Sequence, residues 1–170
     1  MLTTSSNKLA LQWNNKQCGM NLTYSSDCTS VFLREEAYIF RSTISSEGFN
    51  GGRHYWEIHA DSRTENELKI GVTSQVFFDY NTAFCDNKFG FAFYGLAQLR
   101  HGSNATGPQY GKRFKKTGVL GIFLNMDKGT LSFSLNNEDL GVAYTDADLT
   151  RGPLYPAVAL LHCSGCIIKG

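Results

Sequence analysis

A strict period-two alternation of large apolar and small or polar side chains constrains the fold of this chain more than any other feature. It is clearest in TLSFSLN (residues 130–136), which places Leu131, Phe133 and Leu135 on one face and serines on the other. Successive side chains of a β-strand point to opposite faces of its sheet, whereas a helix needs apolar residues every three to four positions. The pattern therefore predicts a strand with one buried and one solvated face.

The same alternation recurs along the chain. HYWEIHA (54–60) predicts Trp56 and Ile58 on the buried face, with Tyr55, Glu57 and His59 on the other. Further strands are predicted where apolar residues alternate or run together: ELKIGV (67–72), KFGFAFYG (88–95), VLGIFLN (119–125) and YPAVALLHCSGC (155–166). We expect Trp56 to be a core residue.

Turn signals separate these strands, and no segment predicts a helix of three turns. MDKG (126–129) predicts a hairpin in which Gly129 takes a positive φ, and NNEDLG (136–141) predicts the next turn. The non-periodic stretches 59–67, 74–88 and 97–117 are predicted to be loops, where binding residues are usually carried. We therefore predict an all-β fold, a two-sheet antiparallel sandwich.

Composition limits the class of protein. The 170 residues fit one domain, with a hydrophobic fraction of 42%, a charged fraction of 18% and a net charge of +1. Such a balance gives no global attraction to nucleic acid or to an anionic membrane, and no apolar run is long enough for a spanning helix. The start of the sequence has no signal-peptide pattern, and five cysteines are an odd number for a disulfide framework. We expect a monomeric, cytoplasmic domain with reduced thiols.

Several residues resemble catalytic or metal-binding groups but lack partners. His54 is expected to pack or hydrogen-bond, because no nucleophile motif accompanies it. His162 and Cys163 would point to opposite faces of one strand, and Cys163-x-x-Cys166 has no second pair to complete a zinc site. The basic stretch KRFKK (112–116) and the Glu35–Glu36 pair are expected to be solvated. The sequence therefore predicts no enzyme, no metal and no cofactor.

Aromatic residues in a predicted loop leave two alternatives open. Phe77, Phe78 and Tyr80 follow the strand ELKIGV at a point where its alternation has ended. Aromatic side chains in a loop are either plugs beneath that loop or anchors for a partner. The sequence favours neither.

Several blocks, in order and spacing, resemble the SPRY domain, called B30.2 when a PRY segment precedes it. They are GGRHYWEI, KIGVTS, GTLSFSLNNEDLGVAY and GPLYPAVALL. The resemblance implies a bent, concanavalin-like jelly-roll sandwich, with a flexible lead-in at 1–8, a divergent PRY-like segment at 9–50 and the SPRY core at 51–170. It also implies a non-catalytic domain that binds a protein or peptide, as in the substrate-recognition ends of ubiquitin ligases and in scaffolds.

The resemblance also implies a set of partner-binding residues. In the SOCS-box branch of the family the peptide site uses an arginine before HYWEI, a tyrosine after the GVT strand and a tryptophan after YPAV. Arg41 and Thr43 match the first position by place, Tyr80 matches the second, and His162 stands near the third in place of tryptophan. We expect Arg41, Tyr80 and His162 to converge on one concave surface. The expected rim residues are Phe78, Arg100 and Tyr110.

A second function class stays open from the sequence. A secreted, lectin-like carbohydrate-binding sandwich would share this architecture and would use the two N-glycosylation sequons at Asn21 and Asn104. The cysteine count and the absence of a signal-peptide pattern favour the protein-binding module.

Overall fold

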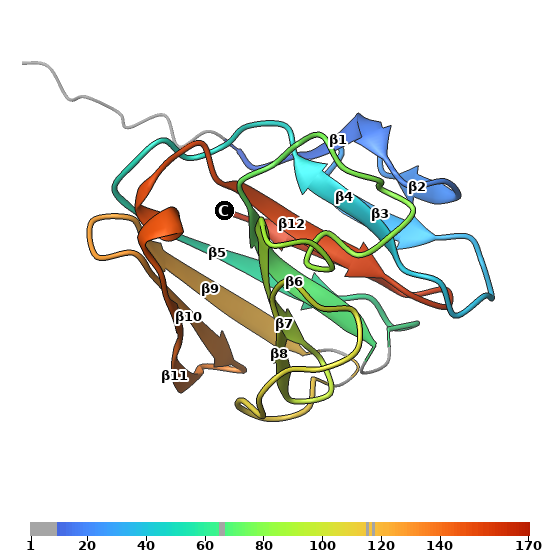
Figure 1. Ribbon diagram of the computed structural model, residues 1–170. Helices are drawn as coiled ribbons and strands as arrows, with labels where there is room; N and C mark the ends of the chain where they lie inside the picture. Colours follow the sequence, from blue (N-terminus) through green and yellow to red (C-terminus); the bar gives the residue numbers. More distant parts are fainter. Residues whose placement is uncertain (1–9, 65–66, 115, 117) are drawn as a thin grey trace, which may run out of the picture.

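Two antiparallel β-sheets stack face to face in the computed structural model, which describes residues 10–64, 67–114, 116 and 118–170 (Figure 1). In spatial order, the six-stranded sheet contains β1 (Trp13–Cys18), β4 (Arg41–Ser45), β12 (Tyr155–Leu160), β6 (Leu68–Thr73), β7 (Gly90–Tyr94) and β8 (Gln98–Arg100). The seven-stranded sheet contains β11 (Glu138–Thr145), β10 (Thr130–Leu135), β9 (Val119–Asn125), β5 (Arg53–Ala60), β13 (Gly165–Lys169), β3 (Ser30–Leu33) and β2 (Leu22–Tyr24). The predicted all-β sandwich is confirmed.

Helical structure is limited in the described part of the chain to η1 (Ala147–Thr150), a single 3-10 turn. Asp146 caps this turn, because its carboxylate accepts a hydrogen bond from the Asp148 N–H at 2.8 Å. None of the described segments forms a helix long and apolar enough to cross a membrane.

The main core lies between the two sheets and follows the alternation of the sequence. Trp56 is 1% exposed and Ile58 is fully buried, whereas Tyr55, on the opposite face of β5, is 51% exposed. In β10 the apolar residues Leu131 and Phe133 are buried and the serines are half-buried. The predicted inward faces of both strands are confirmed.

Two predicted turns differ in their outcome. Gly129 has φ of +72° and closes the β9–β10 hairpin, as predicted. The second turn is shorter than NNEDLG, because Asn136 and Asn137 both take positive φ values and β11 already begins at Glu138. Two asparagines suffice, since Asn adopts the left-handed region more readily than other residues with a side chain.

The predicted strand over 155–166 was wrong. Strand β12 ends at Leu160 and β13 begins at Gly165, in the other sheet, so a turn joins the two layers. His162 and Cys163 occupy this turn with φ values of +46° and +60°. The Ser164 hydroxyl stabilises the turn by accepting the Leu161 N–H at 3.0 Å. The strand argument that separated His162 from Cys163 therefore does not apply.

A second apolar cluster lies on the outer face of the six-stranded sheet. Ala92, Ala157 and Ala159 face outward there, and the 74–88 loop covers them with Phe84 and Cys85. The backbone of the loop approaches closely: a Cβ on Gly90 would lie 2.2 Å from the Phe84 carbonyl oxygen. The small residues between the phenylalanines of KFGFAFYG thus accommodate a covering loop rather than solvent.

Candidate functional site

The 74–88 loop is fixed beside β4 by hydrogen bonds at its centre. The Ser42 N–H donates to the Tyr80 carbonyl at 2.8 Å, and the Ser42 hydroxyl donates to the Thr82 carbonyl at 2.7 Å. The Phe78 and Tyr80 rings lie 4.2 Å apart, and the Tyr80 hydroxyl donates to the Val76 carbonyl at 2.7 Å. Burial raises the pKa of Tyr80 to about 12, so this hydroxyl stays protonated. The loop therefore presents its side chains in one defined arrangement.

Arg41 lies next to Tyr80 but uses its guanidinium internally. Its Nε and Nη2 donate to the two Glu35 carboxylate oxygens at 3.1 and 3.2 Å, and its Nη1 donates to the Asn81 carbonyl at 3.1 Å. These hydrogen bonds from Arg41 hold the pKa of Glu35 below its ordinary value. Buried Arg41 thus joins the segment before β4 to the 74–88 loop. Glu35, expected to be solvated, is its ion-pair partner.

His162 also reaches this region, through the turn that follows β12. Its Nδ1 lies 2.5 Å from the Glu36 carbonyl oxygen, and the Cys163 N–H donates to the Glu35 carbonyl at 2.9 Å. The imidazole stacks on the Tyr38 ring with centroids 4.6 Å apart and planes only 3° from parallel. The structure therefore brings Arg41, His162 and the backbone of Tyr80 to the same region of β4 and β12, whereas the Tyr80 ring turns back toward Val76 and Phe78.

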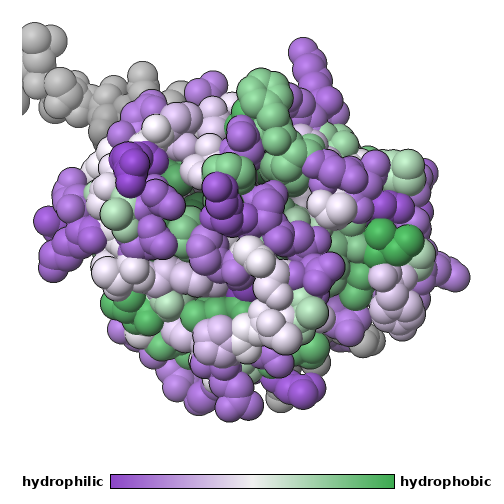
Figure 2. Space-filling view, viewed as in Figure 1, coloured by the Kyte–Doolittle hydropathy of each residue, from purple (hydrophilic) through white to green (hydrophobic). Residues whose placement is uncertain are grey.

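Large apolar side chains are exposed around this group. Phe77 is 78% exposed and Tyr38 is 70% exposed, and Ile39, next to Tyr38 in the chain, is also exposed. Figure 2 shows hydrophobic side chains at the surface where the 74–88 loop runs in Figure 1. We give the name aromatic face to the apolar and aromatic side chains of the two segments that Arg41 joins, together with His162. Its members are Tyr38, Ile39, Phe77, Phe78, Tyr80 and His162.

Two of the predicted site residues face the interior instead. Thr43 is fully buried, and its hydroxyl accepts a hydrogen bond from the Tyr24 hydroxyl at 2.9 Å, so it bridges the two sheets. Tyr110 packs edge-on against Phe93 and Phe133 with centroids 6.0 and 6.1 Å away. Its hydroxyl donates to the Gly141 carbonyl, far along the chain. Neither side chain is part of the aromatic face.

Arg100 lies on the same sheet but at its opposite edge. Strands β12, β6 and β7 separate β4 from β8, which is roughly 19 Å at the usual strand spacing. Arg100 is nearly completely buried, and its Cζ lies 4.9 Å from the centroid of the Tyr94 ring. It therefore does not stand at the rim of the aromatic face.

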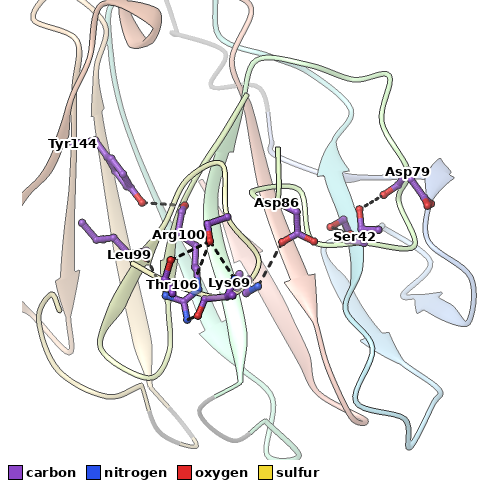
Figure 3. A network of polar contacts seen from close by, with 11 residues as sticks. Ser42, Lys69, Asp79, Asp86, Leu99, Arg100, Thr106 and Tyr144 are labelled. Atoms are coloured by element: carbon purple, nitrogen blue, oxygen red, sulfur yellow. Dashed lines mark hydrogen bonds and ion pairs between the residues drawn. The ribbon is translucent and has the colours of Figure 1, made fainter. Parts of the chain in front are cut away.

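Lys69 was not singled out from the sequence, although it connects these two regions. It is buried in β6, with its Nζ 4.2 Å from the Phe40 ring centroid, 5.2 Å from that of Tyr94 and 3.7 Å from an Asp86 oxygen (Figure 3). A lysine within the apolar run of ELKIGV was the available signal. Tyr38 and Ile39 were also missed, and their signal was a pair of large apolar residues one alanine after two glutamates.

The residues that resembled catalytic groups have structural contacts. His54 stacks on Phe49 with centroids 3.8 Å apart, and its Nε2 lies 2.6 Å from the Gly51 carbonyl oxygen. Burial raises the pKa of Cys85 to about 12 and also raises that of Cys166, so neither thiol is activated as a thiolate. The described residues contain no group of three or more His, Cys, Asp or Glu side chains placed to hold a metal.

Two hollows lie on the seven-stranded sheet, away from the aromatic face. One of about 360 Å³ lies over Gly121 between Tyr55 and Phe123, and one of about 660 Å³ lies beside Phe49 and His54 near the last residue, Gly170. Neither contains a residue that the sequence predicted to bind a partner.

Comparison with known proteins places the chain in a defined group. A family model described as the SPRY domain matches residues 53–170. The ATP-dependent RNA helicase DDX1 of Xenopus laevis is 31% identical over 101 residues, which are 59% of this chain and 13% of the helicase. Butyrophilin subfamily 1 member A1 of Homo sapiens is 31% identical over 126 residues, which are 69% of this chain and 22% of that protein. The chain thus spans a small part of these relatives.

Solved structures share the fold at low sequence identity. The SPRY domain of human HERC1 superposes with a TM-score of 0.73 at 15% identity, covering 92% of this chain and 96% of that one. The TRIM65 PSpry domain superposes with a TM-score of 0.71 at 18% identity, covering 95% of this chain and 90% of that one.

Proposed function

This chain belongs to the SPRY domain family, whose members are protein-interaction modules, and on that premise we propose that it binds a protein partner through the aromatic face. The bound element is a peptide or a surface segment that places apolar side chains against Tyr38 and Phe77. In the parent protein, the domain selects a substrate for a ubiquitin ligase or recruits a partner to a scaffold. The domain itself contributes binding and no catalysis.

The observation that carries this proposal is the exposure of large aromatic side chains on rigid supports. Tyr38 is 70% exposed, and its ring is held by stacking on His162. Phe77 is 78% exposed, and its backbone is held because the carbonyl of the preceding Val76 accepts a hydrogen bond from the Tyr80 hydroxyl. Aromatic anchors that lose little conformational freedom are typical of binding hot spots. Covering water-exposed aromatic surface of this kind with a partner contributes favourable free energy to binding.

In this proposal Arg41 has a role that involves no contact with the partner. Its contacts with Glu35 and Asn81 join the two segments that carry the exposed aromatics. We propose that Arg41 positions the aromatic face, and that Tyr38 and Phe77 contact the partner. Half-buried Phe78 and Tyr80, whose rings pack together, then act as plugs beneath the loop, and exposed Phe77 acts as the anchor.

An affinity capture from cell extract, read by mass spectrometry, tests the proposal with the wild-type domain and Phe77→Ser. The matched control is Phe123→Ser, which removes an exposed phenylalanine from the seven-stranded sheet. We expect one set of captured proteins to be lost with Phe77→Ser and retained with Phe123→Ser. The opposite pattern would move the binding surface to the seven-stranded sheet.

Affinity for the captured partner then gives the magnitude. Tyr38→Ala and Phe77→Ala are each expected to weaken binding by roughly 30-fold, because truncating a hot-spot aromatic costs about 2 kcal/mol. Thermal unfolding of the same variants should stay close to wild type, since both side chains are mostly exposed. Unchanged affinity in both variants would remove the aromatic face from the interaction.

A further inference from the structure

Four side chains form an alternating aromatic and cationic row across the outer face of the six-stranded sheet. Lys69 Nζ lies between the Phe40 ring, at 4.2 Å, and the Tyr94 ring, at 5.2 Å. Arg100 continues the row, with its Cζ 4.9 Å from the same Tyr94 ring. Lys69 and Tyr94 are direct cross-strand partners, and Arg100 pairs with Ala92 two residues away. The row runs from the segment that carries Tyr38 to strand β8.

The buried charge of Lys69 has few contacts that offset the free-energy cost of its burial. It is 2% exposed, and its single carboxylate contact among the described residues is Asp86 Oδ1 at 3.7 Å, too long for a hydrogen bond. The same Asp86 oxygen is buried without any hydrogen-bond partner (Figure 3). Stacking on aromatic rings stabilises a cation but satisfies none of its N–H donors.

Arg100 is compensated even less. It is 5% exposed, and its guanidinium donates to two carbonyl oxygens of its own segment, Leu99 at 3.3 Å and Ala105 at 3.4 Å. Both distances lie beyond the usual range for N–H···O bonds. Its Nε is buried with no acceptor in the part of the chain that the structure describes. A guanidinium offers five donors in a planar fork, so most of this fork is unused.

The charges of this row do not balance. Lys69 has one carboxylate contact, Asp86, and Arg100 forms no ion pair with any acidic side chain of the described residues. Glu67 is close enough to raise the pKa of Tyr94, after burial as the main cause, but it contacts neither cation as an ion pair. Burying a charge without a partner is costly, so a site with one surplus positive charge is poised to accept one negative charge.

We infer that Arg100 binds a carboxylate, supplied by an aspartate or glutamate side chain of the protein partner, and that the positive charge of Lys69 beside the same Tyr94 ring adds to the attraction. The inference rests on the proposed function, because the row begins at Phe40, directly after the exposed Tyr38 and Ile39. The planar fork of Arg100 matches the two oxygens of a carboxylate. A single surplus charge matches a carboxylate better than a phosphate, which carries up to two negative charges. The partner segment thus combines apolar residues with an acidic one.

The segment above Arg100 allows such a group to enter. Ala105 and Gly107 lie over the guanidinium and are both exposed, and a Cβ on Gly107 would lie 3.0 Å from Arg100 Nη1. The incoming carboxylate replaces the long bond to the Ala105 carbonyl and reaches the unused Nε–H. Asp86 lies on the Lys69 side of the row and repels the same carboxylate, so it limits the affinity.

The first experiment observes the unused donor itself. The Nε–H signal of Arg100, assigned by its loss in Arg100→Gln, is followed by NMR while the domain is titrated with acetyl-aspartyl amide. Acetyl-asparaginyl amide is the neutral control, acetyl-phosphoseryl amide is the phosphate arm, and the Nε–H of exposed Arg53 is the internal reference. We expect a saturable shift of Arg100 with the aspartyl compound alone. No shift, an equal shift at Arg53, or a shift only with the phosphoseryl compound would overturn the inference.

Asp86→Asn gives a test that does not depend on removing a buried cation. It leaves a second surplus positive charge, so the acetyl-aspartyl amide should bind more tightly, by roughly tenfold for the loss of one close repulsive charge. A purely structural role for the row predicts no gain. Unchanged or weaker binding to Asp86→Asn would therefore count against the site.

The captured partner separates this inference from the proposed function. Arg100→Gln, verified as folded by thermal melting, should weaken partner binding roughly tenfold or more, because a hydrogen bond to a charged group is lost. If Phe77→Ala weakens binding and Arg100→Gln does not, the carboxylate site is wrong and the aromatic face stands. If neither variant weakens binding, both fail.

Discussion

Replacing Trp56 by alanine tests whether the alternation of HYWEIHA describes real burial. Trp56 is 1% exposed, its ring centroid lies 5.5 Å from that of Phe49, and it pairs with Ile122 of β9. A buried aromatic removes about 200 Å² from water, which at about 25 cal/mol per Å² gives roughly 5 kcal/mol as an upper value. Measured Trp→Ala changes in protein cores are about 3–5 kcal/mol. We therefore expect a loss of about 4 kcal/mol in the free energy of unfolding.

Urea denaturation measures this loss. Unfolding is followed by far-UV circular dichroism rather than by fluorescence, because the variant lacks one of the tryptophans. The matched control is Tyr55→Ala, one residue earlier on the same strand, because Tyr55 is 51% exposed on the opposite face. It should change the free energy of unfolding by no more than about 1 kcal/mol. In a thermal scan the Trp56 variant should melt roughly 8–16 °C below wild type, at about 2–4 °C per kcal/mol for a domain of this size.

Equal losses for the two variants would refute the reasoning, since each removes a large aromatic side chain from β5 and only Trp56 is buried. A changed denaturant slope in Trp56→Ala would also refute the simple burial argument. In that case the variant would alter the extent of surface exposed on unfolding rather than the packing of one native state.

Two further predictions concern backbone contact and charge. Gly71→Ala should prevent stable folding, because a Cβ there would lie 1.8 Å from the Phe91 carbonyl oxygen. The control Gly51→Ala should change the melting temperature little, because a Cβ there would have nothing within 4 Å. Equal melting curves for the two variants would contradict this prediction. Glu35→Gln should destabilise the domain at pH 7 and converge with wild type by pH 3. Arg41 lowers the pKa of Glu35 in the folded state, so the stabilisation is present above the ordinary value of 4.5 and is lost as the pH falls through the folded-state pKa. A constant difference from pH 7 to pH 3 would show that the carboxylate charge is not involved.

Much of the candidate site could be placed from the sequence, but the roles within it could not. Tyr80 and His162 were predicted by resemblance, and the structure places His162 and the backbone of Tyr80 with Arg41 in the same region of β4 and β12. The exposure of each side chain was not predictable. Arg41, for example, is buried because it bonds to Glu35, six residues before it, and to Asn81 in a distant loop. Whether a loop aromatic is covered depends on contacts that no local pattern records.

The fold class and the inward faces of the strands were determined by the sequence itself. An alternation of period two assigns each side chain to one face without reference to any other strand, so Trp56, Leu131 and Phe133 could be placed in the core from local spacing. The same rule failed at His162, because a turn has no period and a positive φ depends on the contacts that hold it.

Only the tertiary structure decided what lies over each outer face. Alternation sends Ala92 and Ala157 outward, but it does not state that the 74–88 loop covers them while Tyr55 and Phe123 on the other sheet stay exposed. The tertiary structure also brings Lys69 and Arg100 to the ring of Tyr94, from the two strands that lie on either side of β7. Burial and charge balance are properties of the assembled neighbours, and the two cations Lys69 and Arg100 are 31 residues apart along the chain. The surplus charge of this site exists only in the folded protein.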